Sequence, residues 1–121
     1  MSEDNKARVR RYFAETLSKG NLSVVDEIAE VAMAESLKRG ALNLRSAFAD
    51  VHDEVQDQIA EGDKVVTRFA GGGVHHGVFM GVTPTGKPVT WTGIAIDRFA
   101  DGKIVERWTI IDVLALQRDF V

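Results

Sequence analysis

The sequence contains no cysteine, no long apolar run and no block of positive charge, and each absence excludes a class of protein. Without cysteine there is no disulfide, no thiolate nucleophile and no cysteine-bound metal. No stretch approaches the roughly eighteen apolar residues of a membrane helix, and the polar segment Met1–Lys6 is not followed by the apolar core of a signal peptide. We therefore expect a cytoplasmic protein that does not associate with membranes.

The charges of the chain are nearly balanced. Fifteen Lys and Arg residues oppose eighteen Asp and Glu, and the net charge of −3 is spread along the sequence. Nucleic acids bind clustered positive charge, so they are not expected partners. The adjacent histidines His75 and His76 lack the spacing of a metal-binding pair, and Gly71–Gly73 is not followed by the Lys-Ser or Lys-Thr of a phosphate loop. We expect no bound metal and no cofactor.

The composition is that of one globular domain. The chain has 121 residues, of which 45% are hydrophobic and 27% are charged. At this size, folding buries roughly two-thirds of the surface of the unfolded chain, which is enough for a core. We expect a single domain over residues 1–121.

The first part of the chain has helical spacing of apolar residues, up to about His52. The predicted buried face of a first helix consists of Val9, Tyr12, Phe13, Thr16 and Leu17. A second helix is predicted from Ser23, with a buried stripe of Val25, Ile28, Ala29, Ala32 and Met33. At Gly40 either one long helix breaks or two helices meet, and the helical step continues to Val51.

The rest of the chain has the patterns of antiparallel strands and tight turns. Strands are predicted at residues 55–59, 64–69, 89–99 and 104–113, with turns at 61–63 and 100–103. Gly71–Gly73 predicts a bulge or a sharp bend. Helices followed by antiparallel strands predict an α+β fold with the helices on one face of the sheet.

Asp112 is the most informative polar residue. With a period of two, it shares a face of the last strand with Trp108 and Ile110. It is either a turn-forming residue or a carboxylate in an apolar pocket, where a raised pKa would suit a general base.

Two aromatic residues are candidates for a cavity wall. Trp91 shares a face with the small residues Gly93 and Ala95, which either shape a cavity or let a helix approach the sheet. Tyr12 lies on the buried face of the first helix, where its hydroxyl either binds a ligand or is satisfied within the core. Arg68 either pairs with a carboxylate such as Asp97 or is solvated.

Two segments resemble a known family. Residues 73–87 read GVHHGVFMGVTPTGK and are similar to the Gly-Thr-His-x-Gly-x-Phe-x-Gly and Pro-Thr-Gly-Lys motifs of SnoaL-like polyketide cyclases. Residues 101–112 read DGKIVERWTIID and resemble the same family's Asp-Gly-Lys-Ile-x-Glu-x-Trp-x-x-x-Asp. The similarity covers most of the chain and is most specific from Glu61 to Asp112.

The resemblance implies the cone-shaped α+β fold of the nuclear transport factor 2 superfamily. In that fold, N-terminal helices pack in the concave face of a strongly curved antiparallel sheet, and a hydrophobic cavity opens at one end. Members are commonly homodimers through the sheet, so the resemblance implies a second copy of the chain as a partner.

The resemblance also implies a site and a reaction. Asp112 matches the aspartate that acts as general base for an intramolecular aldol closure in the characterised cyclases. The expected wall for a small hydrophobic carbonyl compound consists of Tyr12, Phe79, Trp91 and Trp108. His75 matches a recurring histidine and is expected to contact the substrate without a catalytic role. The implied activity is a polyketide cyclase-like reaction of lyase or isomerase type.

One departure from the family keeps other functions open. Family members usually carry a short strand and a Pro/His-rich loop between the second and third helices, and residues 25–38 contain neither. This favours a non-catalytic small-molecule-binding or dimerisation module as the alternative. A limonene-epoxide-type hydrolase would need two aspartates bridged by an arginine, and the neighbours Asp97 and Arg98 are expected on opposite faces of a strand.

Overall fold

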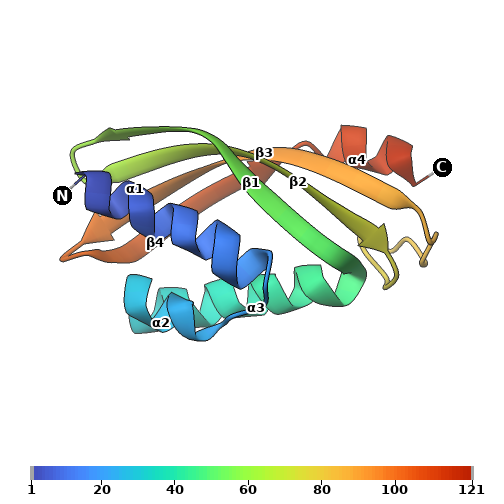
Figure 1. Cartoon of the computed structure of the whole chain (residues 1–121), viewed down its shortest axis with the longest axis horizontal. Coiled ribbons are helices and arrows are strands. Elements are labelled where there is room, and N and C mark those ends of the chain that lie inside the picture. The colour runs from blue at the N-terminus through green and yellow to red at the C-terminus, as the bar shows by residue number, and fades with distance from the viewer. Residues whose placement is uncertain (1, 121) are drawn as a thin grey trace.

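A computed structural model describes residues 2–120 as a four-stranded antiparallel sheet with the N-terminal helices packed along one face and a short helix after the last strand (Figure 1). The sheet order is β1-β2-β3-β4. The elements are α1 Ser2–Arg11, the π-helical segment η1 Tyr12–Leu17, α2 Ser23–Ile28, α3 Val31–Ala47, β1 Phe48–Glu61, β2 Lys64–His75, β3 Pro88–Ala100, β4 Lys103–Ile111 and α4 Val113–Asp119. This arrangement confirms the predicted α+β class.

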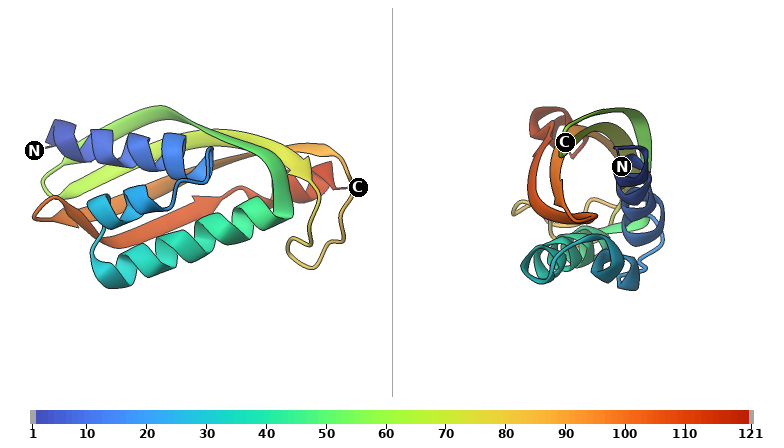
Figure 2. Two further views of the ribbon diagram at one scale, coloured as in Figure 1. Left: turned by 60° about the horizontal axis from the view of Figure 1, so that its bottom comes forward. Right: turned by 90° about the vertical axis from the view of Figure 1, so that its left-hand side faces the viewer.

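The sheet is strongly curved, and its concave side holds the N-terminal helices. Viewed along the long axis, the strands form an arch that α1, α2 and α3 close from the other side (Figure 2). The predicted face of the first helix is buried throughout, from Val9 to Leu17. Phe13 on this face lies 4.8 Å, between ring centroids, from Phe69 of β2. Burying a side chain of this size contributes about 1.5–3 kcal/mol, so the contact fastens the helix to the sheet.

The second helical region breaks at a different place from the one predicted. Gly40 lies inside α3, and the chain leaves the helical path between α2 and α3 instead, at Ala29 and Glu30. Ala29 forms a parallel bridge with Ile104 of β4, which pulls the backbone into an extended conformation. The Glu30 side chain then caps α3 by accepting a hydrogen bond from the backbone N–H of Met33. The predicted stripe through Ala29 and Met33 is therefore divided between two helices.

The first strand begins earlier than predicted, because α3 ends at Ala47 and β1 starts at Phe48. Its pairing with β2 is irregular between Ala49 and His52 and again between Val55 and Asp57. At each irregularity β1 contains one extra residue, so the alternation of inward- and outward-facing side chains shifts by one position. Between the two shifts, the inward-facing residues are Val51, Asp53 and Val55.

The predicted bulge or bend at Gly71–Gly73 does not interrupt β2, which continues to His75; the irregularity at this level has its extra residue in β1, between Ala49 and His52. The glycines instead let β1 approach closely: a Cβ at Gly71 would clash with Asp53 and with the backbone of His52. The predicted hairpin at residues 100–103 is confirmed, with Asp101 and Gly102 both at positive φ. Within residues 2–120, every helix is too short or too polar to cross a membrane.

Candidate functional site

Two hollows of similar size lie on opposite sides of the sheet. The interior cavity, between the concave face and the helices, has a volume of about 470 Å³. An open groove of about 450 Å³ lies on the other, convex face. Both volumes lie within the range that holds small-molecule ligands.

The interior cavity has an aromatic and aliphatic wall contributed by helices and strands. Its apolar lining consists of Tyr12, Phe13, Leu17, Met33, Leu37, Leu44, Phe69, Phe79, Trp91 and Ile111. Its charged lining consists of Asp53 from β1 and Arg107 from β4. A mainly apolar cavity with a few fixed polar groups can hold a hydrophobic ligand and orient it.

Asp53 is a buried carboxylate held by Trp91, which lies two strands away on the same face of the sheet, across Gly71. Only 9% of the residue is exposed, and its Oδ1 accepts a hydrogen bond of 2.8 Å from Trp91 Nε1. Its Oδ2 is buried and has no hydrogen-bond partner within residues 2–120. Burial raises the pKa of Asp53 to about 6, against the opposing effects of the Trp91 hydrogen bond and of His52 and Arg107.

Asp97 and Arg107 form a buried ion pair between β3 and β4. Arg107 Nε lies 3.6 Å from Asp97 Oδ1, with side-chain exposures of 9% and 0%. Burial raises the pKa of Asp97, while the guanidinium partly opposes the shift. Asp97 makes no hydrogen bond through its carboxylate within the described residues, so the nearby charge of Arg107 is its main compensation.

Arg107 also contacts the first helical segment. Its guanidinium carbon lies 4.8 Å from the Tyr12 ring centroid, and Arg107 Nε donates a 3.1 Å hydrogen bond to Thr109 Oγ1. Its Nη1 is buried and finds no hydrogen-bond acceptor among the described residues. Burial raises the pKa of Tyr12, so its phenol stays protonated. The cavity is thus lined by a phenol, a guanidinium and one carboxylate, that of Asp53, while Asp97 lies behind Arg107 in the core.

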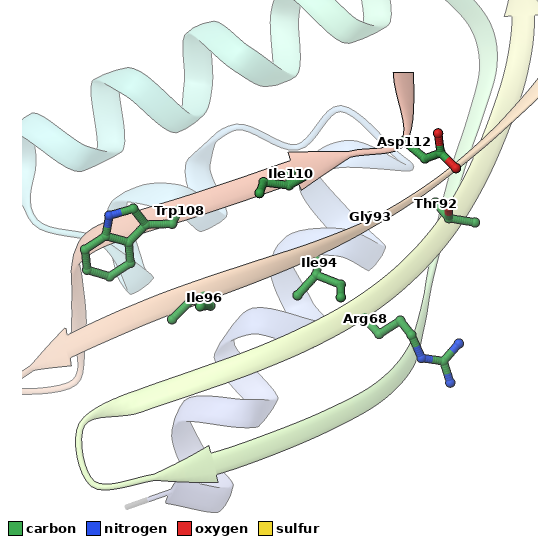
Figure 3. Close-up of a pocket in the computed structure, with 8 residues that line it drawn as sticks. All are labelled: Arg68, Thr92, Gly93, Ile94, Ile96, Trp108, Ile110 and Asp112. Atoms are coloured by element: carbon green, nitrogen blue, oxygen red, sulfur yellow. The ribbon is translucent and has the colours of Figure 1, made fainter. Parts of the chain in front are cut away.

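The predicted site residues are divided between the two faces. Tyr12, Phe79 and Trp91 line the interior cavity together. Trp108 and Asp112 line the outer groove, where Figure 3 shows them with Ile110 on one side of the sheet and α1 behind it. The prediction that Asp112 and Trp108 face the same cavity as Tyr12 is therefore wrong.

Asp112 lies on the convex side of the sheet, at the end of the outer groove. The residue follows the last strand, is exposed, and caps α4 by accepting a 3.1 Å hydrogen bond from Ala115 N–H through Oδ1. This placement agrees with the turn-forming interpretation of Asp112, and its catalytic role stays a prediction. Arg68 lies exposed in the same groove, so of its two predicted alternatives the structure agrees with solvation and not with pairing to Asp97.

His75 lies outside the linings of both hollows. It is fully buried, and its ring packs 4.5 Å from Phe120 and 5.6 Å from Phe48, measured between centroids. Its Nδ1 accepts a 3.2 Å hydrogen bond from Thr85 N–H. These contacts anchor the loop before β3 to the end of the sheet, so we assign His75 a structural position rather than a substrate contact.

The sequence interpretation missed Asp53 and Arg107, although both are charged residues next to recognised patterns. The signal for Arg107 was its alternation with Trp108, which places the arginine on the inner face once the tryptophan faces outward. The signal for Asp53 was its position across a hairpin from Gly71–Gly73. Glycines on one strand leave room for a large side chain on the neighbouring strand. As predicted, Asp97 and Arg98 lie on opposite faces of β3. Asp97 is the buried one, and Arg107 supplies the inward-facing arginine from the next strand.

Comparisons with known proteins agree with this fold. A family model described as SnoaL-like polyketide cyclase matches residues 7–120. TsrD from Streptomyces laurentii superposes with a TM-score of 0.90 at 20% identity over 99% of this chain and 96% of that one, which supports the fold. Comparison with curated protein sequences gave no significant match.

Two further solved structures have higher sequence identity. AclR, a putative hydroxylase from Streptomyces galilaeus, is 28% identical with a TM-score of 0.86, over 99% of this chain and 82% of that chain. IdmH, a putative polyketide cyclase from Streptomyces antibioticus, is 27% identical with a TM-score of 0.80, over 95% of this chain and 96% of that chain. The architecture is the predicted nuclear transport factor 2-like cone.

Proposed function

Because the chain belongs to the SnoaL-like polyketide cyclase family, we propose that it binds a small hydrophobic carbonyl compound and converts it by acid–base chemistry. The reaction class is cyclase, an intramolecular aldol closure, or isomerase, and it uses no cofactor. The observation that carries this proposal is the interior cavity of about 470 Å³, whose wall is apolar but includes Asp53 and Arg107. Similarity to IdmH, a putative polyketide cyclase, supports the same reaction class.

The chemistry of the cavity suits such a substrate. Removing a proton next to a carbonyl leaves an enolate, so the reaction needs a base, a group that stabilises negative charge and a wall that excludes water. The wall around Tyr12, Phe69 and Trp91 supplies the apolar surface, while the buried charges supply proton transfer and charge stabilisation. We therefore place the reaction in the interior cavity.

The two tryptophans of the chain allow a direct test of where the ligand binds. The variant Trp108→Phe leaves only Trp91, in the interior cavity, and Trp91→Phe leaves only Trp108, in the outer groove. We expect the bicyclic ketone 2-tetralone to change the fluorescence of Trp91 in the first variant and to leave that of Trp108 unchanged in the second. A response from Trp108 alone would place the ligand in the outer groove and contradict the proposal.

The same titration decides the predicted role of Asp112. Asp112 can act as general base only on a ligand in the outer groove, because it does not line the interior cavity. If Trp108 responds and Asp112→Asn abolishes turnover, Asp112 is the base. If a ligand binds tightly, its binding persists in Asp112→Asn and no product forms, the chain is a non-catalytic binding module.

The exposed apolar residues of the convex face support a homodimer through the sheet. Ile94, Trp108 and Ile110 are 49%, 48% and 78% exposed on neighbouring strands. Apolar side chains gathered in one groove are typical of interaction surfaces. A second copy packed there would cover the groove and leave the interior cavity accessible.

A second candidate function is hydrolysis of an epoxide, and the position of Arg107 favours it. Arg107 lowers the pKa of both Asp53 and Asp97 through its charge, so two carboxylates act near one guanidinium. Such a set can activate water and protonate an opening ring. Incubation with an epoxide such as styrene oxide in ¹⁸O-labelled water distinguishes the two functions, since only hydrolysis gives a labelled diol.

A further inference from the structure

We propose that Asp53 is the general base of the interior cavity and that Arg107 Nη1 holds the carbonyl oxygen of an enolisable ketone. This assignment rests on the function proposed above and adds roles that the resemblance does not supply. It replaces Asp112 with two residues from the first and last strands of the sheet.

The carboxylate of Asp53 is fixed at one oxygen and free at the other. Trp91 Nε1 holds Oδ1 at 2.8 Å, and the backbone N–H of Asp53 donates a 2.9 Å hydrogen bond to Ser18 Oγ. Oδ2 is buried without a hydrogen-bond partner in the described part of the chain. Asp53 lines the interior cavity, and a carboxylate held in this way keeps one acceptor oxygen unused.

The guanidinium of Arg107 is fixed in a corresponding manner. Asp97 Oδ1 lies 3.6 Å from Nε, Thr109 Oγ1 lies 3.1 Å from it, and the Tyr12 ring lies beneath the guanidinium carbon. Nη1 is the buried nitrogen left without a partner among residues 2–120. The neighbours of Arg107 therefore set its position and leave one charged donor unused.

Asp53 Oδ2 is an unused acceptor and Arg107 Nη1 is an unused donor, and both residues line the same apolar cavity. Together they indicate what kind of ligand would satisfy both atoms. Each buried polar atom without a partner carries a desolvation penalty, which a complementary ligand relieves. A carbonyl oxygen accepts from Arg107 Nη1, while an acidic C–H next to that carbonyl points to Asp53 Oδ2. The apolar wall, with Phe69 and Trp91, accommodates the carbon skeleton.

The proton-transfer step balances without a co-reactant. Asp53 Oδ2 takes the proton as the C–H bond breaks, and the electron pair moves into the new C=C bond while the carbonyl oxygen becomes an enolate oxygen beside Arg107. In a cyclase reaction, the enolate carbon then bonds to a second carbonyl carbon of the same molecule, and the resulting alkoxide takes the proton back. In an isomerase reaction, the proton returns to a different carbon.

The electrostatic surroundings suit this role. Burial raises the pKa of Asp53 to about 6, so the carboxylate is ionised at neutral pH yet more basic than a free aspartate. The charged and titratable groups that act on Asp53 and its neighbours are His52, Arg107, Tyr12 and Asp97. The charges of His52 and Arg107 lower the pKa of Asp53, so they keep it from rising further.

The test follows deuterium incorporation next to the carbonyl of 2-tetralone in D₂O by proton NMR, with binding measured separately through Trp91 in the Trp108→Phe background. We expect Asp53→Asn to bind the ketone as tightly as the parent but to lose the catalysed exchange by about 100-fold or more. The matched control is Asp57→Asn, an exposed acid on the same strand, which should exchange at the parental rate. Arg107→Lys keeps the charge and should weaken both binding and exchange.

Each other outcome has a distinct meaning. Exchange at the parental rate in folded Asp53→Asn, checked by circular dichroism, overturns the assignment of the base. Binding of 2-tetralone at Trp91 without any catalysed exchange by the parent also overturns it, while binding in the cavity stands. Absence of binding by the parent overturns the proposed function and the assignment together.

Discussion

Asp97 and Arg107 lie directly opposite each other in the β3–β4 ladder, and Nε of the arginine is 3.6 Å from Oδ1 of the aspartate inside the core. Burying such a pair costs so much desolvation free energy that an apolar pair of similar size is often as stable. A contribution to folding therefore does not explain the pair, whose arginine lines the interior cavity.

Removing one member of this pair should be much more damaging than removing both. We expect Arg107→Met to lower the free energy of unfolding by about 3–5 kcal/mol at neutral pH, because Asp97 is left buried without its counter-charge. The double variant Asp97→Leu/Arg107→Met should recover most of this loss. Urea unfolding of the three proteins measures the effect, and equal stability of the single and double variants would show that the charges are not coupled.

Asp53 should make the stability of the protein fall as the pH rises. Its pKa is raised to about 6 in the folded state from an ordinary value of 3.8, so between these values the folded protein holds more protons than the unfolded chain. The free energy of unfolding therefore decreases over this range, by about 3 kcal/mol in total, and stays lower above pH 6. Asp97, whose pKa is also raised, contributes in the same direction.

The measurement compares denaturant unfolding of the parent and of Asp53→Asn from pH 3 to pH 8. The stability difference should move in favour of the variant by about 3 kcal/mol between pH 3 and pH 8, since asparagine has no charged form to bury. Asp57→Asn provides the exposed control and should run parallel to the parent. A constant difference across the pH range would mean that Asp53 titrates normally.

The general fold could be predicted from the sequence because the patterns that specify it are local. The buried face of α1 and η1 follows from helical spacing, and the hairpin before β4 follows from Asp101 and Gly102. The class of the fold then follows from the order of helices and strands. These features depend on residues close together in the chain.

The cavity could not be predicted in the same way, because it depends on where the strands shift register. The irregularity between Arg98 and Phe99 moves the partner of Asp97 by one residue, to Arg107. The two irregularities in β1 turn Asp53 inward. The alternation of side chains along a strand also defines two faces without showing which one is buried. Trp108 is of a type usually found in cores, yet it is 48% exposed.

Gly71 should be essential for the contact between Asp53 and Trp91. A Cβ at this position would meet the Asp53 carboxylate and the backbone of His52, and would lie 2.7 Å from Trp91 Nε1. We expect Gly71→Ala to destabilise the protein by about 1–3 kcal/mol and to alter the fluorescence of Trp91. Gly40→Ala is the control: a Cβ there meets nothing within 4 Å, so the helix preference of alanine should stabilise α3 by up to about 1 kcal/mol. Equal effects of the two substitutions would show that the close approach at Gly71 is unimportant.

The convex face should control the oligomeric state. Ile110 is 78% exposed in the outer groove, and a lysine in its place would bring two positive charges into a symmetric interface. We expect Ile110→Lys to weaken self-association by about 100-fold or more, measured by light scattering over a range of concentrations, because charges buried at an interface without partners cost several kcal/mol. Val31→Lys is matched in exposure, at 79%, but lies at the start of α3, outside the outer groove, and should associate like the parent. A parent protein that is monomeric at all concentrations, or a dimer that tolerates Ile110→Lys, would exclude this face as the interface, and its apolar groove would then need another explanation.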